Sequence, residues 1–102
     1  MDRVYEFATD KKGDVTKILE AEPYAADSFA RVGYRIRDGG SLSEDKTKMY
    51  IYISSSEEFV KKADERLKDV ATVLKADVAA RIVGKIKAEE EAAESGLGSL
   101  FG

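Results

Sequence analysis

The sequence contains no cysteine, histidine, asparagine, glutamine or tryptophan, and only one proline. Without cysteine the chain has no disulfide framework, no thiolate metal site and no cysteine nucleophile. Without histidine, a zinc site built on imidazole and a histidine-dependent catalytic triad are excluded. Without asparagine there is no acceptor for N-glycosylation. Because the commonest catalytic and metal-binding side chains are missing, we predict no metal site and no bound cofactor.

The 102 residues are 43% hydrophobic and 36% charged, with a formal net charge of −3. This length and hydrophobic content suffice for one globular domain. The charged fraction exceeds the usual ~25%, and abundant lysine and glutamate without asparagine, glutamine or cysteine is typical of proteins from hot environments. We therefore expect a thermophilic source. No apolar run resembles a secretory signal or a membrane span, so we expect a cytoplasmic protein that does not enter the membrane.

Alternating apolar residues predict three strands, at residues 3–9, 30–37 and 48–54. Between the first two strands, Asp14 is the expected N-cap of a short helix. Between the second and third, residues 38–47 form a loop longer than a usual hairpin connection, so we expect it to be mobile.

The second and third strands are expected to pair as an antiparallel hairpin, because this keeps their apolar faces together. The predicted register sets Ile36 opposite Met49 and Arg35 opposite Tyr50. In the third strand, Met49, Ile51 and Ile53 share the core face, and Tyr50 and Tyr52 share the other face.

The C-terminal half is predicted to be mainly helical. A capping box of Ser55 and Glu58 starts a helix at residues 56–75, which has apolar residues at helical spacing. Residues 77–94 fit a helix better than a strand, because they run without a turn into a segment rich in alanine and glutamate. Residues 95–102 are expected to be a flexible tail.

These elements predict a single α+β domain over residues 1–94. We expect a two-layer sandwich in the order β-α-β-β-α-α, with a three-stranded antiparallel sheet and helices on one face. If residues 78–86 form a strand instead, the order becomes the ferredoxin-like β-α-β-β-α-β. The expected single core contains Tyr5, Phe7, Val32, Tyr34, Ile36, Ile51, Ile53, Phe59, Leu67 and Leu74.

One candidate site is an Arg/Tyr face on the outer side of the sheet. Aromatic rings stack on bases and guanidinium groups contact phosphates, so such a face suits single-stranded nucleic acid. Two alternatives stay open: the residues form cross-strand pairs that stabilise the sheet, or the last helix covers the face. The net negative charge also disfavours phosphate binding. The Arg/Tyr face comprises Arg31, Arg35, Arg37, Tyr50 and Tyr52.

A second candidate site is an apolar stripe on the predicted last helix, formed by Val78, Ile82, Val83 and Ile86. The stripe can face a protein partner, and a homodimer is the commonest arrangement of that kind. The alternative is that the stripe packs on the sheet of its own chain.

Other clusters carry weaker chemistry. The carboxylates Asp38, Glu44 and Asp45 are of the type that binds hard cations, but their spacing does not match a calcium loop and favours a solvated turn. The serines at 54–56 have no predicted base to activate them, and the spacing of the acidic residues does not establish an acid–base pair. We therefore predict that the protein is not an enzyme.

The segment Lys48–Glu58 after the basic strand, with the closing Gly98–Gly102, resembles small archaeal proteins of unknown function. This resemblance implies a compact α+β domain and assigns no functional residue. The leading hypothesis is a non-enzymatic interaction module, self-associating or bound to a protein partner. The second is a nucleic-acid-binding domain that uses the Arg/Tyr face.

Overall fold

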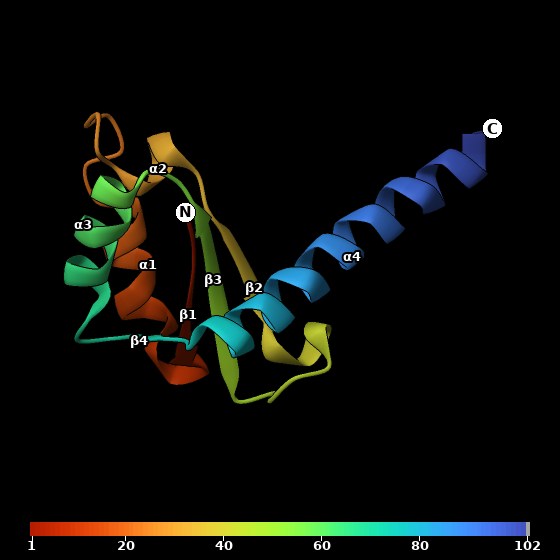
Figure 1. Cartoon of the computed structure of the whole chain (residues 1–102), viewed down its shortest axis with the longest axis horizontal. Coiled ribbons are helices and arrows are strands. Elements are labelled where there is room, and N and C mark those ends of the chain that lie inside the picture. Colours follow the sequence, from red (N-terminus) through yellow and green to blue (C-terminus); the bar gives the residue numbers. More distant parts are fainter. Residues whose placement is uncertain (102) are drawn as a thin grey trace.

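The computed structural model describes the backbone of residues 1–101 and the side chains of residues 1–93. Its strands form one antiparallel sheet in the order β2-β3-β1-β4 (Figure 1). The elements in chain order are β1 (Asp2–Ala8), the 3₁₀ helix η1 (Thr9–Lys11), α1 (Lys12–Glu20), α2 (Phe29–Val32), β2 (Arg35–Asp38), the 3₁₀ helix η2 (Gly39–Leu42), β3 (Lys48–Ser54), α3 (Glu57–Leu67), β4 (Thr72–Val73) and α4 (Ala76–Phe101).

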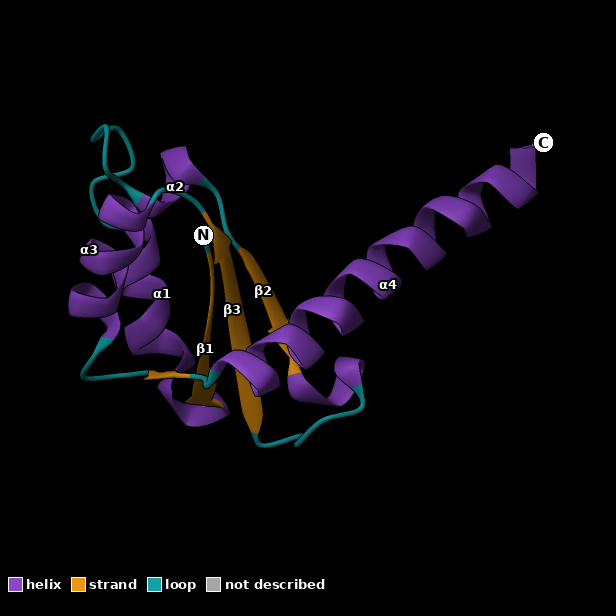
Figure 2. Ribbon diagram, viewed as in Figure 1, coloured by secondary structure: helices purple, strands orange, loops and turns teal. Residues whose placement is uncertain are grey.

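Helices cover both faces of this sheet. Figure 2 shows α1 and α3 on one side of the strands and α4 on the other. The α+β class predicted from the sequence is confirmed, but a two-layer sandwich with helices on one face is wrong. The reason is the connection after α3, which runs through β4 along the sheet edge and delivers the chain to the opposite face. There the amide of Leu74 donates to the Val4 carbonyl at 3.0 Å.

The sheet has four strands rather than the three that we expected. Six of the elements follow the alternative order β-α-β-β-α-β: they are β1, α1, β2, β3, α3 and β4. The last strand of this series is Thr72–Val73, however, and not residues 78–86, which are helical. α2 and α4 are additions to this order.

β3 lies in the middle of the sheet and is buried on both faces, since all five residues of Met49–Ile53 are buried. The predicted core face is confirmed, because Ile51 and Ile53 pack with Tyr5 in the cluster under α1 and α3. The expectation of a single core is wrong. A second cluster lies under α4 and contains Val4, Leu42, Tyr50, Tyr52, Ile82 and Ile86.

The segment 30–37, predicted as one strand, is split. Ser28 caps α2, because its hydroxyl accepts a hydrogen bond from the amide of Arg31 at 3.2 Å. A helix cap of this kind satisfies an amide that the helix itself leaves free. Gly33 ends α2 at a φ of 93°, a conformation that favours glycine, and β2 begins only at Arg35.

The shortened β2 pairs with β3 in a different register from the predicted one. Ile36 lies opposite Ile51 and Arg37 opposite Tyr50, whereas we expected Met49 and Arg35 at these positions. The shift is two residues. Because side chains alternate with a period of two, such a shift keeps each residue on its predicted face.

The boundaries of the first and third helices also differ from the prediction. α1 begins at Lys12, so Asp14 lies in its first turn and is not the N-cap. The cap of α3 is Ser56, whose hydroxyl accepts from the amide of Phe59 at 3.2 Å, and not Ser55. α3 ends at Leu67, because the chain must leave the helix there to reach the sheet edge as β4.

The helical interpretation of residues 77–94 is confirmed by α4. This helix crosses the sheet at its N-terminal end, and its C-terminal part projects away from the rest of the molecule (Figure 1). Residues 95–102 were predicted as a flexible tail. The backbone of α4 continues to Phe101, and the side chains from residue 94 onward lie outside the described part, so the flexibility of this segment stays a prediction.

The loop 38–47, which we expected to be mobile, is held by specific contacts. The Asp38 carboxylate accepts from the amide of Gly40 and caps η2. Asp45 accepts from both the amide and the hydroxyl of Thr47, at 2.8 and 2.6 Å. The Asp45 carbonyl in turn accepts from the amide of Lys48 at 3.1 Å, where β3 begins.

Candidate interaction surface

The Arg/Tyr face predicted from the sequence is covered by α4. Tyr50 and Tyr52 are each only 3% exposed and pack against Ile82 and Ile86 of that helix. Rings buried in this way have no free surface on which a base could stack. Of the alternatives that the sequence left open, the structure bears out the one in which the last helix covers this face.

The arginines of this face are neutralised by the same helix. Arg35 pairs with Glu90 at 2.6 Å and also stacks over the Tyr52 ring at 5.3 Å from its centroid. Arg37 pairs with Glu89 at 3.2 Å and with Glu90 at 3.5 Å. Arg31 lies in α2 and not on the sheet. The structure thus does not bring the five predicted residues together as one exposed surface.

The stripe on the last helix, Val78, Ile82, Val83 and Ile86, faces inward. Ile82 and Ile86 are completely buried against the sheet, and Val83 is partly buried against the same cluster. The stripe is therefore the intramolecular contact that holds α4 in place, which is the alternative that the sequence left open. A helix that buries this side must expose the opposite one.

The three loop carboxylates do not converge on a common point. Asp38 and Asp45 accept hydrogen bonds from backbone amides of their own loop. Glu44 instead contacts α4, where Arg81 donates to its carboxylate at 2.9 Å and Lys85 forms a second ion pair with it. The hydrogen bond from Lys85, followed by that from Arg81, lowers the pKa of Glu44. Among the described residues, no group of three or more potential metal ligands occurs.

A buried tyrosine joins β1 to α3 on the other side of the sheet. The Tyr5 hydroxyl donates to Asp64 at 2.6 Å, and Arg3 pairs with the same carboxylate at 3.1 Å. Burial, and then the hydrogen bond to Asp64, raises the pKa of the Tyr5 phenol far above its usual range. Burial, and then the charge of Glu6, raises the pKa of Tyr50 to about 12.

These two phenols should make the fold sensitive to alkali. In the unfolded chain tyrosine ionises at about pH 10, so between about pH 10 and 12 the folded protein keeps protons that the unfolded chain has lost. Its free energy of unfolding should therefore fall as pH rises, by up to about 1.4 kcal/mol per pH unit for each of Tyr5 and Tyr50. Below about pH 10 this contribution is fully present.

Urea denaturation at a series of pH values measures this slope. The matched control is Tyr50→Phe, which keeps the ring and should remove the contribution of Tyr50. A free energy of unfolding that stays constant above about pH 10 would contradict the burial of both hydroxyls.

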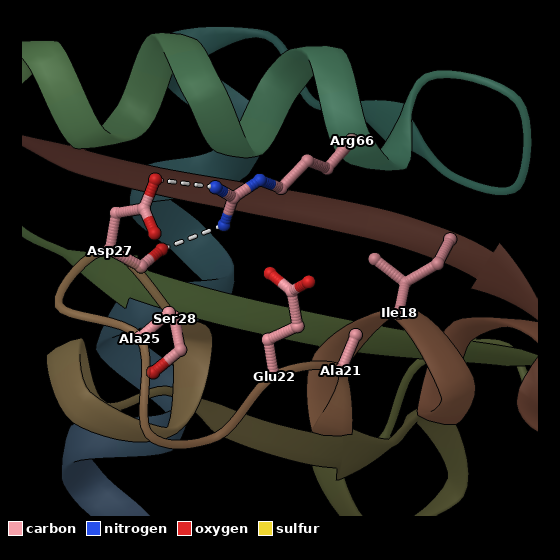
Figure 3. A pocket seen from close by; sticks show the side chains of 7 residues that line it. All are labelled: Ile18, Ala21, Glu22, Ala25, Asp27, Ser28 and Arg66. Carbon is pink, nitrogen blue, oxygen red and sulfur yellow. Dashed lines mark hydrogen bonds and ion pairs between the residues drawn. The ribbon is translucent and has the colours of Figure 1, made fainter.

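A small cavity of about 260 Å³ lies between α1, α3 and the loop before α2. In Figure 3, Arg66 reaches across it and donates to the carboxylate and the backbone carbonyl of Asp27, at 2.9 and 2.7 Å. Arg66 lowers the pKa of Asp27. The Ser28 hydroxyl is engaged with the Pro23 carbonyl. These contacts tie the loop to α3 and leave no activated nucleophile among the side chains that line the cavity.

One part of the exposed side of α4 is lined mainly by small residues. We call it the outward face; it consists of the exposed residues Ala76, Asp77, Ala80, Gly84, Lys87, Ala88 and Glu91. Four of these seven are alanine or glycine and recur at intervals of four residues, which places them along one side of the helix. An ideal Cβ built on Gly84 meets nothing within 4 Å, so the face is open at that point.

A groove of about 410 Å³ runs beside this face. It is lined by Asp2 of β1 and, on α4, by Ala76, Ala79, Ala80, Val83, Gly84 and Lys87. Two of the exposed large apolar residues are chain neighbours of this region. They are Met1, which precedes Asp2 and is 58% exposed, and Val73, which precedes α4 and is 40% exposed. The groove and the outward face share Ala76, Ala80, Gly84 and Lys87, so they form one surface.

Reasoning from sequence missed this surface, because only large apolar residues were considered as partner contacts. The signal was present as alanine or glycine at positions 76, 80, 84 and 88. Small residues at this spacing let a second helix approach closely, because no side chain holds the two backbones apart.

Comparison with protein-family models, curated proteins and solved structures finds no match for this chain. Among the described residues, no helix has the length and hydropathy needed to cross a membrane. Functional inference therefore rests on the geometry of this chain itself.

Proposed function

We propose that this protein is an interaction module that self-associates, with the outward face of α4 and the adjoining groove as its contact surface. The observation that carries the proposal is the two-sided character of α4. Its inner side is buried against the sheet through Ile82 and Ile86. Its outer side offers alanine, glycine and a groove over the same turns.

A second copy of the chain fits this surface better than a long flexible ligand would. A helix packs best against another helix where small residues allow an interaxial distance of about 8 Å. The other copy supplies such a helix with matching small residues. From Ala76 to Glu91 the outward face is about 24 Å long at a rise of about 1.5 Å per residue. This contact is small for a protein interface, so we expect a dissociation constant in the micromolar range.

The wild-type protein should therefore change from monomer to dimer in sedimentation experiments between about 1 and 500 μM. Replacing Gly84 with arginine should raise the dissociation constant by about a hundredfold, because a long charged side chain would separate the two helices. The isolated fold should tolerate this change, since Gly84 is open to solvent and arginine favours the helix more than glycine does.

The matched control is Ala30→Arg, which places the same side chain at an exposed position of α2. This variant should dimerise like the wild type. A wild-type protein that stays monomeric at every concentration, or a Gly84→Arg variant that dimerises as well as Ala30→Arg, would overturn the proposal.

A further inference from the structure

The outward face has a charge pattern that specifies how two copies would meet. Asp77 lies in the first turn of α4, and Lys87 lies ten residues later on the same exposed side. Among the ion pairs formed by the described side chains, neither residue takes part in one. The midpoint between them falls between Ala80 and Gly84, the two small residues at the centre of the face.

We infer, resting on the proposed function, that two copies pack with their α4 helices antiparallel, so that Asp77 of each copy lies opposite Lys87 of the other. In this arrangement Ala80 of one copy meets Gly84 of the other at the point of closest approach. A two-fold axis perpendicular to the helices generates both contacts twice. The interface is therefore self-complementary in shape and in charge.

The remaining charge of the face agrees with this orientation. In the same register, Glu91 of one copy lies beside the start of α4 in the other. A helix N-terminus favours a carboxylate, and Lys75 lies next to this start in the sequence. In a parallel pair, Asp77, Lys87 and Glu91 would each lie opposite the same residue of the other copy. Since like charges in contact are unfavourable, the antiparallel pair is the one that the sequence of α4 supports.

Charge reversal tests the inference. Asp77→Lys and Lys87→Asp should each weaken dimerisation by about tenfold, because each turns both attractive contacts into repulsive ones. The double variant Asp77→Lys/Lys87→Asp should restore the wild-type dissociation constant. In a parallel pair, either single reversal would leave the number of like-charge contacts unchanged and the affinity unaltered.

Cross-linking gives a second measurement, because the chain has no cysteine of its own. Ala80→Cys mixed with Gly84→Cys should form a disulfide-linked dimer faster than either variant alone, since only the mixture sets the two thiols opposite each other. Each variant cross-linking fastest with itself would indicate a parallel pair and overturn the inference.

The outcomes separate this inference from the proposed function. A wild-type protein that never dimerises refutes both. A dimer that Gly84→Arg dissociates, but in which charge reversal changes nothing, refutes only the antiparallel register. A wild-type dissociation constant in the double variant supports the register. It also shows that the weaker dimerisation of Asp77→Lys is not caused by a loss of helix stability, because the double variant carries the same lysine at position 77.

Discussion

Replacing Ile86 with alanine should lower the free energy of unfolding by about 2–5 kcal/mol, the usual cost of truncating a buried isoleucine. Ile86 is completely buried and lies between α4 and the rings of Tyr50 and Tyr52. Truncation leaves a cavity in the second cluster that the rigid central strand cannot close. Urea denaturation followed by circular dichroism measures the loss.

The control for this variant is Glu91→Ala on the same helix, measured at protein concentrations too low for dimerisation. Glu91 is exposed in the monomer, so this change should alter the free energy of unfolding by no more than about 0.5 kcal/mol. Tyrosine fluorescence provides an independent readout, because the chain has no tryptophan. It should change in Ile86→Ala and stay unchanged in Glu91→Ala. Equal stability of the two variants would show that α4 does not rest on the sheet.

The strands β1 and β3 and their core faces could be predicted because their signals are local. Alternation over seven residues identifies β3 and places Ile51 and Ile53 on the face that packs with Tyr5. The two-sided burial of β3 was also visible in principle, since Met49–Ile53 is an unbroken apolar run, which is typical of strands covered on both faces. Alternation alone placed Tyr50 and Tyr52 on the other face, and it left open whether that face is covered.

The sequence could not decide whether α4 covers the Arg/Tyr face, because this placement depends on β4. A strand of two residues, Thr72–Val73, has no detectable periodicity, and its pairing with Tyr5 and Glu6 of β1 is a contact between distant parts of the chain. That pairing decides which face of the sheet the following helix reaches. An amphipathic helix carries no signal for this choice, since its apolar side suits either face.

The same limit explains why the alternatives for both candidate sites stayed open. Cover by the last helix was one alternative for the Arg/Tyr face, and packing on the sheet of its own chain was one for the apolar stripe of α4. The structure shows that they are partners of each other, through Ile82 and Ile86 packed on the tyrosines and through Arg35 and its ion pair with Glu90. What remains for binding is the side of α4 that neither prediction considered.

Replacing Gly39 with alanine should lower the free energy of unfolding by about 1–3 kcal/mol, because the loop 38–47 has no room for a methyl group there. A Cβ at this position would lie 2.0 Å from the Asp45 carbonyl oxygen and 2.7 Å from that of Lys48. Both are backbone atoms, so the chain itself must move. The movement would disturb the hydrogen bond from the Glu44 amide to the Gly39 carbonyl, which is 2.8 Å long.

The neighbouring Gly40→Ala is the matched control, since its Cβ would meet side-chain atoms at ordinary distances: Lys46 at 3.6 Å and the Asp38 carboxylate oxygens at 3.8 and 3.9 Å. It should change the free energy of unfolding by no more than about 0.5 kcal/mol. Because Glu44 also holds Arg81 and Lys85 of α4, Gly39→Ala should loosen that helix as well. Hydrogen exchange along α4 should therefore accelerate in Gly39→Ala and not in Gly40→Ala. Unchanged exchange in both variants would show that the loop does not anchor the helix.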